Sequence, residues 1–97
     1  MAFGDEMENG IIEYTTLGVD PVPHLTIGIR FDGSQQGYQV TLGTDNAYTA
    51  IFSILQALEI DVWERLPGKS CRVKRVNRLI DVIGHIYKDQ WSKRIDA

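Results

Sequence analysis

The chain has 97 residues, of which 43% are hydrophobic and 24% are charged, and these ordinary proportions argue against intrinsic disorder. Its net charge of −3 argues against a general attraction to nucleic acid. The sequence shows neither a signal-peptide pattern nor an apolar run of membrane length. Since its one cysteine, Cys71, has no partner for an intrachain disulfide, we expect a cytoplasmic protein without membrane contact.

The charges are divided unevenly along the chain. Residues 1–61 hold nine acidic residues and one basic residue, a sum of −8, whereas residues 62–97 hold four acidic and nine basic residues, a sum of +5. This division indicates that one end of a small domain meets an anion or an acidic partner. Opposite charge at two ends also allows copies to pair head to tail, so a homo-oligomer is expected.

The first half of the chain predicts an arm followed by three strands. Residues 1–9 are acidic and aperiodic and are predicted to form a flexible arm, and residues 10–97 a single domain. Three segments carry the β-branched or alternating pattern of strands: 11–17, 25–31 and 38–42. Residues 32–37 contain two glycines and are expected to form the turn between the second and third strands.

One principal helix is predicted next, because apolar residues recur at helical spacing from Ala47 to Leu58. The opposite side of this helix is polar but hardly charged. The helix is expected to start with a side-chain cap from one of three residues: Thr44, Asp45 or Asn46. A short helical turn over residues 61–66 should then press Trp63 and Leu66 onto the core.

The second half ends in a predicted hairpin. Residues 71–76 and 79–87 have strand patterns and are joined by a two-residue turn at 77–78. The tail is expected to fold back through Trp91. The whole pattern, β-β-β-α-β-β, predicts an α+β fold: a mainly antiparallel sheet of about five strands with one helix packed on it.

The basic residues gather in this C-terminal hairpin. Arginine suits planar, bidentate capture of phosphate or carboxylate, which predicts an anion-binding surface; a solvated edge that discourages strand pairing is the alternative. Strand alternation separates Arg75 from Arg72 and Lys74. Aromatic and amide side chains could add stacking and hydrogen bonds to a base. The predicted ligand-binding residues are Lys69, Arg72, Lys74, Arg75, Arg78, Tyr87, Gln35 and Tyr38.

No catalytic or cofactor signature stands out in the sequence. Gly68-Lys69-Ser70 resembles the end of a phosphate-binding loop, but Trp63 stands where that motif needs its first glycine. His24 and His85 lack the closely spaced partners of a metal site, and Cys71 lacks a partner base. We therefore expect a non-enzymatic protein with no catalytic residues, no metal and no cofactor.

Three stretches together resemble a group of small uncharacterised phage and prophage proteins. They are Gly33–Tyr38, Trp63–Lys69 with Arg72 and Val73, and Ile83–Asp89 with Trp91. The resemblance implies a phage-encoded accessory protein in the host cytoplasm, of the kind that counters host defence.

Two functions are then expected, with different partners. The leading one is a non-enzymatic anti-defence protein that binds an anionic small molecule, such as a nucleotide signal, through the basic hairpin. The alternative is an inhibitor of a host defence protein complex, similar to anti-CRISPR proteins. It would mimic nucleic acid or cover its target with its acidic half or the polar side of its helix.

Overall fold

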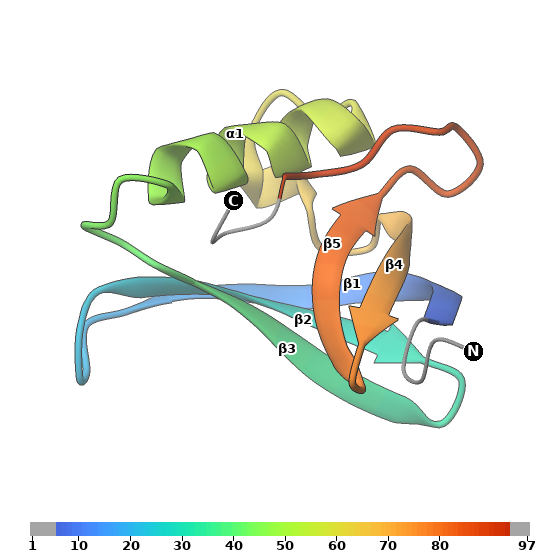
Figure 1. Cartoon of the computed structure of the whole chain (residues 1–97), viewed down its shortest axis with the longest axis horizontal. Coiled ribbons are helices and arrows are strands. Elements are labelled where there is room, and N and C mark those ends of the chain that lie inside the picture. The colour runs from blue at the N-terminus through green and yellow to red at the C-terminus, as the bar shows by residue number, and fades with distance from the viewer. Residues whose placement is uncertain (1–5, 94–97) are drawn as a thin grey trace.

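The computed structural model describes residues 6–93 and contains five strands, one α-helix and one short 3-10 helix (Figure 1). In chain order the elements are β1 (Glu6–Gly18), β2 (His24–Phe31), β3 (Ser34–Thr41), α1 (Ala47–Leu58), the 3-10 turn Trp63–Arg65, β4 (Ser70–Val76) and β5 (Leu79–Gly84). The α+β prediction with the order β-β-β-α-β-β is confirmed. None of the helices in this part of the chain has the length and hydropathy needed to cross a membrane.

The strands form one sheet in the order β3-β2-β1-β4-β5, and every neighbouring pair is antiparallel. β1 lies in the centre, where its first part pairs with β4 and its second part with β2. Both edge strands therefore run in the same direction as β1. They approach each other where Gln36 Nε2 donates to the Arg78 carbonyl at 2.9 Å. The sheet thus curls into a partly open barrel, and its connections, with the helix between the third and fourth strands, are those of an OB-type barrel.

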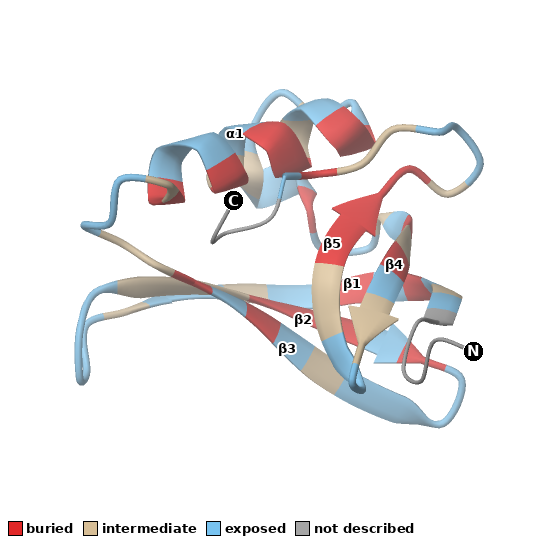
Figure 2. Cartoon of the chain, viewed as in Figure 1, coloured by how far each residue is buried: buried red, intermediate tan, exposed pale blue. Residues whose placement is uncertain are grey.

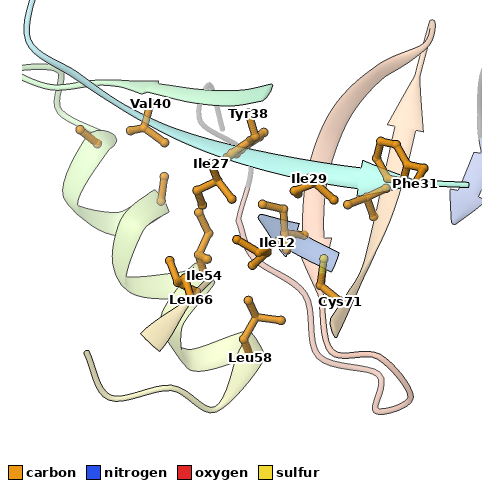
Figure 3. Packing of buried hydrophobic residues seen from close by; sticks show 14 residues of the cluster. Ile12, Ile27, Ile29, Phe31, Tyr38, Val40, Ile54, Leu58, Leu66 and Cys71 are labelled. Carbon is orange, nitrogen blue, oxygen red and sulfur yellow. The ribbon is translucent and has the colours of Figure 1, made fainter. Parts of the chain in front are cut away.

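The hydrophobic core fills the inside of this barrel, and α1 lies across one end of it (Figure 3). Figure 2 shows buried positions on the strands of the barrel and on α1, and the buried residues of α1 lie on the side that faces the barrel. The core members include Ile12, Ile27, Ile29, Val40, Ile54, Leu58, Cys71, Val73 and Ile83. Leu66 is fully buried and Trp63 packs against the same cluster, which confirms the predicted docking of the short helical turn.

The N-terminal boundary differs from the sequence prediction. Residues 6–9, assigned to the flexible arm, form the start of β1 and pair with residues 72–75 of β4. Acidic residues of one strand thereby lie beside basic residues of the other, an arrangement that stabilises a pair of strands. The sequence of residues 6–9 alone does not show that β4 will pair with them. Residues 1–5 of the predicted arm lie outside the described residues.

The first hairpin turn is shorter than predicted. β3 begins at Ser34, so only Asp32 and Gly33 make the turn, and Gly33 has a φ of 79°. An Asp-Gly pair is enough for a two-residue turn. Residues 34–37, expected in the turn, extend the strand ladder to β2 instead.

The second half of the chain follows the prediction with two differences. The turn at Asn77 and Arg78 is confirmed, and both residues have positive φ, at 54° and 68°. The predicted strand over 79–87 ends at Gly84, and the chain then turns back so that Trp91 bridges to Gly84. The predicted side-chain cap of α1 is absent at Asn46; Thr44 Oγ1 instead donates to the Thr41 carbonyl.

Candidate functional site

Arg72, a predicted ligand residue, binds the loop that follows β5. Its Nε donates to the carbonyl of His85 and its Nη2 to the carbonyl of Lys88, each at 2.8 Å. The guanidinium also lies 4.9 Å from the centroid of the Trp91 ring. Charge-assisted hydrogen bonds to two carbonyls fix the loop against β4. Arg72 therefore serves the fold directly.

Lys74 and Arg75 lie on opposite faces of β4, as strand alternation predicted. Lys74 Nζ lies 4.3 Å from the Trp91 ring centroid on the outer face. Arg75 Nη2 pairs with Glu8 Oε2 at 2.8 Å, and its guanidinium lies 5.1 Å from the ring centroid of Phe31 in the core. The two side chains cannot reach one ligand from these positions.

The other predicted residues are spread over the surface or buried. Lys69 is half-buried before β4, Arg78 is exposed in the turn, and Tyr87 is 77% exposed with its ring against the edge of His85. Tyr38 is only 4% exposed and points into the barrel, so it cannot stack on a ligand from outside. Gln35 is exposed on β3 and donates to Glu13. The eight predicted residues do not form one site.

His85 and the loop after it close against the C-terminal end of α1. The Nδ1 atom of His85 accepts from the backbone N–H groups of Tyr87 and Lys88 at 3.3 and 3.2 Å. Lys88 Nζ lies 2.8 Å from Glu59 Oε2. This hydrogen bond lowers the pKa of Glu59, and the same contact raises the pKa of Lys88. The stretch that carries the phage resemblance therefore packs this loop onto the helix.

Cys71 is buried, and the candidate metal ligands of the described chain do not cluster. Burial in the core raises the pKa of Cys71 to about 12, so its thiol is a poor nucleophile. Among residues 6–93, no three His, Cys, Asp or Glu side chains gather as metal ligands.

A better candidate for a ligand-binding surface than the basic hairpin lies on the outer face of β1, β2 and β3. This face is turned away from the core and α1 (Figure 1). Ile27 and Ile29 of β2 are core residues, and Gly28 between them belongs to the outer face, although it too is buried. The antiparallel register sets Gly28 opposite Gly37 of β3. The rows on either side pair Arg30 with Gln35 and Thr26 with Gln39.

A β-bulge brings an aromatic ring onto this face. Ile12 pairs with Ile29 and Tyr14 with Gly28, so Glu13 is an extra residue in β1. With a regular two-residue period, Tyr14 would point inward like Ile12; the bulge turns it outward. Its ring lies over Gly28, where an added Cβ would collide with it. The ring is 39% exposed and shields the glycine backbone.

We call this surface the Tyr14 platform and define it by Tyr14, Gly28, Gly37, Gln35 and Gln39. An added Cβ at Gly37 would meet only Thr26, at 3.3 Å, so the surface beside the ring is open. A glycine in a strand often marks a place where another group approaches the backbone closely. The platform therefore has room for a flat group beside an aromatic ring, with an amide side chain in the row on either side.

Arg30 brings positive charge to the edge of the platform. Its Nε lies 2.7 Å from Glu13 Oε2, the bulged residue, and more than half of the Arg30 side chain is exposed. A hollow of about 320 Å³ continues from Arg30 along the outer face, lined also by Asn9, Gly10, Ile11, Phe31, Asp32, Ser70 and Ile86. The exposed lining of this hollow is largely apolar. The alternation of residues 25–31 placed Gly28 opposite the apolar face, whereas Gly37 was expected in the turn and no sequence signal pointed to Tyr14.

Comparison of this chain with protein-family models, with curated proteins and with solved structures finds no match. The similarity to OB-type barrels therefore rests on the order and connections of the strands alone.

Proposed function

We propose that this protein is a non-enzymatic binding protein that takes a nucleotide or a short single-stranded nucleic acid on the Tyr14 platform. The observation that carries the proposal is the exposed ring of Tyr14, turned outward by the bulge and seated over Gly28. Stacking of a base on an aromatic ring is tolerant of sequence and is the usual means of holding single strands. Support from the fold is by analogy only: OB barrels bind ligands on the outer face of their second and third strands.

Each part of such a ligand has a partner on this surface. The base stacks on Tyr14, the exposed amide of Gln39 bonds to one of its edges, and Gln35 bonds to another when its amide leaves Glu13. The guanidinium of Arg30 meets a phosphate, at the cost of part of its pairing with Glu13. Because one guanidinium, that of Arg30, meets the phosphate, binding should weaken only slightly as salt rises.

This proposal keeps the anionic ligand expected from the sequence but moves it from the basic hairpin to the sheet. Arg72 and Arg75 are engaged with the loop carbonyls and with Glu8, which weighs against the hairpin. The inhibitor alternative has less support. Glu8 and Glu59 lie in ion pairs and so do not present a run of free carboxylates like that of nucleic acid.

The biological role that we propose for this binding comes from the resemblance to phage proteins. A phage-encoded accessory protein of this kind would bind a host signal nucleotide or host nucleic acid and so counter defence. Self-association and a cytoplasmic location also remain proposals.

The experiment that tests the proposal is calorimetry with linear and cyclic nucleotides, together with fluorescence anisotropy of labelled single-stranded oligonucleotides at low salt. The Tyr14→Leu variant keeps an apolar side chain over Gly28 but removes the ring, and it should lose about 1–3 kcal/mol per stacked base. Tyr87→Leu is the matched control, since Tyr87 is exposed elsewhere. Absence of binding to every ligand, or equal binding by Tyr14→Leu, would sink the proposal.

A further inference from the structure

Glu13, the extra residue of the bulge in β1, brings a carboxylate to the Tyr14 platform. In a regular strand, consecutive side chains point to opposite faces of the sheet. Here the bulge sets Tyr14 on the outer face, and the side chain of Glu13 contacts two residues of that same face, Arg30 of β2 and Gln35 of β3. Two neighbouring residues of β1 therefore supply an aromatic ring and a negative charge to one face.

The carboxylate of Glu13 engages both polar groups that a ligand of the platform needs. Its Oε2 lies 2.7 Å from Arg30 Nε, and its Oε1 accepts from the amide of Gln35. Arg30 is the proposed partner of the phosphate, and Gln35 of one edge of the base. A carboxylate and a phosphate offer a guanidinium similar oxygen acceptors. Glu13 thus competes with an anionic ligand for the same contacts.

The charge around Arg30 limits how much negative charge a ligand can bring. Asp32, two residues further along, lines the same hollow as Arg30, so one positive and two negative charges gather here, a sum of −1. Glu13 pairs with Nε of Arg30, and the guanidinium carries further N–H donors on a side chain that is 56% exposed. A phosphate on those donors shares the guanidinium with Glu13. Each negative charge that it carries then adds repulsion.

We propose that Glu13 makes the platform selective for a phosphodiester over a phosphomonoester. A phosphodiester carries one negative charge, whereas a phosphomonoester carries about −1.5 to −2 at pH 7. Arg30 can offset one charge, but a second charge faces Glu13 and Asp32. The ligand class is then the linkage within a single strand or within a cyclic nucleotide. This inference rests on the proposed function, because it concerns the ligand of the same platform.

The test uses three ligands that share one base and differ in charge: adenosine, cyclic adenosine monophosphate and linear adenosine monophosphate. NMR titration of the full chain at low salt gives a dissociation constant for each, even where binding is weak. The wild type should bind the cyclic phosphodiester about fivefold more tightly than the linear phosphomonoester, the effect of one extra like charge near the surface.

Glu13→Gln removes the charge but keeps the size of the side chain and an oxygen that accepts from Gln35. An exposed ion pair adds little to stability, so the variant should stay folded. Both phosphates should bind it more tightly, by about fivefold for the cyclic one, and the preference for the cyclic form should disappear. Adenosine, which has no phosphate, should bind as it does to the wild type.

Asp61→Asn is the matched control, since it removes one carboxylate from the exposed ion pair with Arg65, away from the platform. All three affinities should stay at their wild-type values. An equal gain in this control, or weaker phosphate binding or an unchanged preference in Glu13→Gln, would overturn the role of Glu13. The proposed function survives these outcomes if Tyr14→Leu still weakens binding. If no adenine ligand binds but an oligonucleotide does, the inference alone fails; if nothing binds, both fail.

Discussion

The basic C-terminal hairpin and the outer face of β1–β3 differ in what remains open once their charged side chains are engaged, since Arg30 of the outer face pairs with Glu13 just as Arg75 pairs with Glu8. In the hairpin, Arg72 binds two loop carbonyls and Arg75 pairs with Glu8. On the outer face, the ring of Tyr14 has an exposed side and Gly37 leaves space beside it. A cluster of charge in a sequence is therefore a weaker guide to a binding site than a side chain that the fold leaves open.

The uneven charge of the chain has the same explanation. The acidic start of β1 pairs with the basic β4, and Glu59 at the end of α1 binds Lys88 of the C-terminal loop. Residues from the −8 half and the +5 half thus meet within one molecule. Ion pairs between oppositely charged residues therefore join the two halves of the chain within the fold.

The largest expected effect concerns Cys71, which lies on β4 in the hairpin. Burial raises its pKa to about 12 from the usual 9.0, so its thiolate population near neutral pH falls roughly a thousandfold. The native protein should react with a disulfide reagent only as fast as it unfolds. We would measure the rate with and without urea. Rapid reaction of the folded protein would show that the hairpin is open rather than packed.

Arg72→Met should show most clearly that the hairpin contributes to stability and the Tyr14 platform to ligand binding. The variant loses two charge-assisted hydrogen bonds to the loop and should lower the free energy of unfolding by about 3 kcal/mol. Urea denaturation measures this loss. Ligand affinity of the Tyr14 platform should change little in the folded variant. A variant of normal stability that no longer binds would instead place the site in the hairpin.

Gly37→Val should have the opposite effect, with little change in stability and a loss of ligand affinity. An added Cβ meets only Thr26, at 3.3 Å, so a small shift of that exposed-face side chain should let the fold tolerate the change, and valine suits a strand. It nevertheless occupies the open part of the Tyr14 platform and should reduce ligand affinity about tenfold, or about 1.4 kcal/mol. Calorimetry with a melting curve as control checks both expectations. Unchanged affinity would remove Gly37 from the site.

The smallest effect is a dependence of stability on pH from the Glu59–Lys88 contact. The pKa of Glu59 is lowered in the folded protein, so its contribution is present above the ordinary value of 4.5 and is lost as pH falls through the folded pKa. The pKa of Lys88 is raised, so its contribution is present below 10.5 and is lost as pH rises through the folded pKa. Both side chains are well exposed, so the effect should be small.

Comparison of the Glu59→Gln variant with the wild type in urea melts across pH isolates this contribution. The difference in stability should be largest at neutral pH and shrink at both extremes. A difference that does not vary with pH would mean that the contact contributes through packing rather than charge.

The parts of the fold that local patterns determine were predictable from the sequence. The alternation of residues 25–31, the apolar spacing of α1 and the turn at Asn77 and Arg78 all appear in the structure as expected. Features that depend on a partner far away in the sequence were not predictable. The bulge at Glu13 is defined by its register with β2, and residues 6–9 form a strand beside β4. The platform depends on that bulge, so the sequence did not indicate that the ring of Tyr14 lies on the outer face.

The most direct test of the central claim, that the platform and not the basic hairpin meets the ligand, is a two-dimensional NMR titration of the labelled protein with a short single-stranded oligonucleotide. We predict that the amide shifts concentrate at Tyr14, Gly28, Gln35, Gly37 and Gln39. Shifts confined to residues 69–78 and 85–91 would contradict the account.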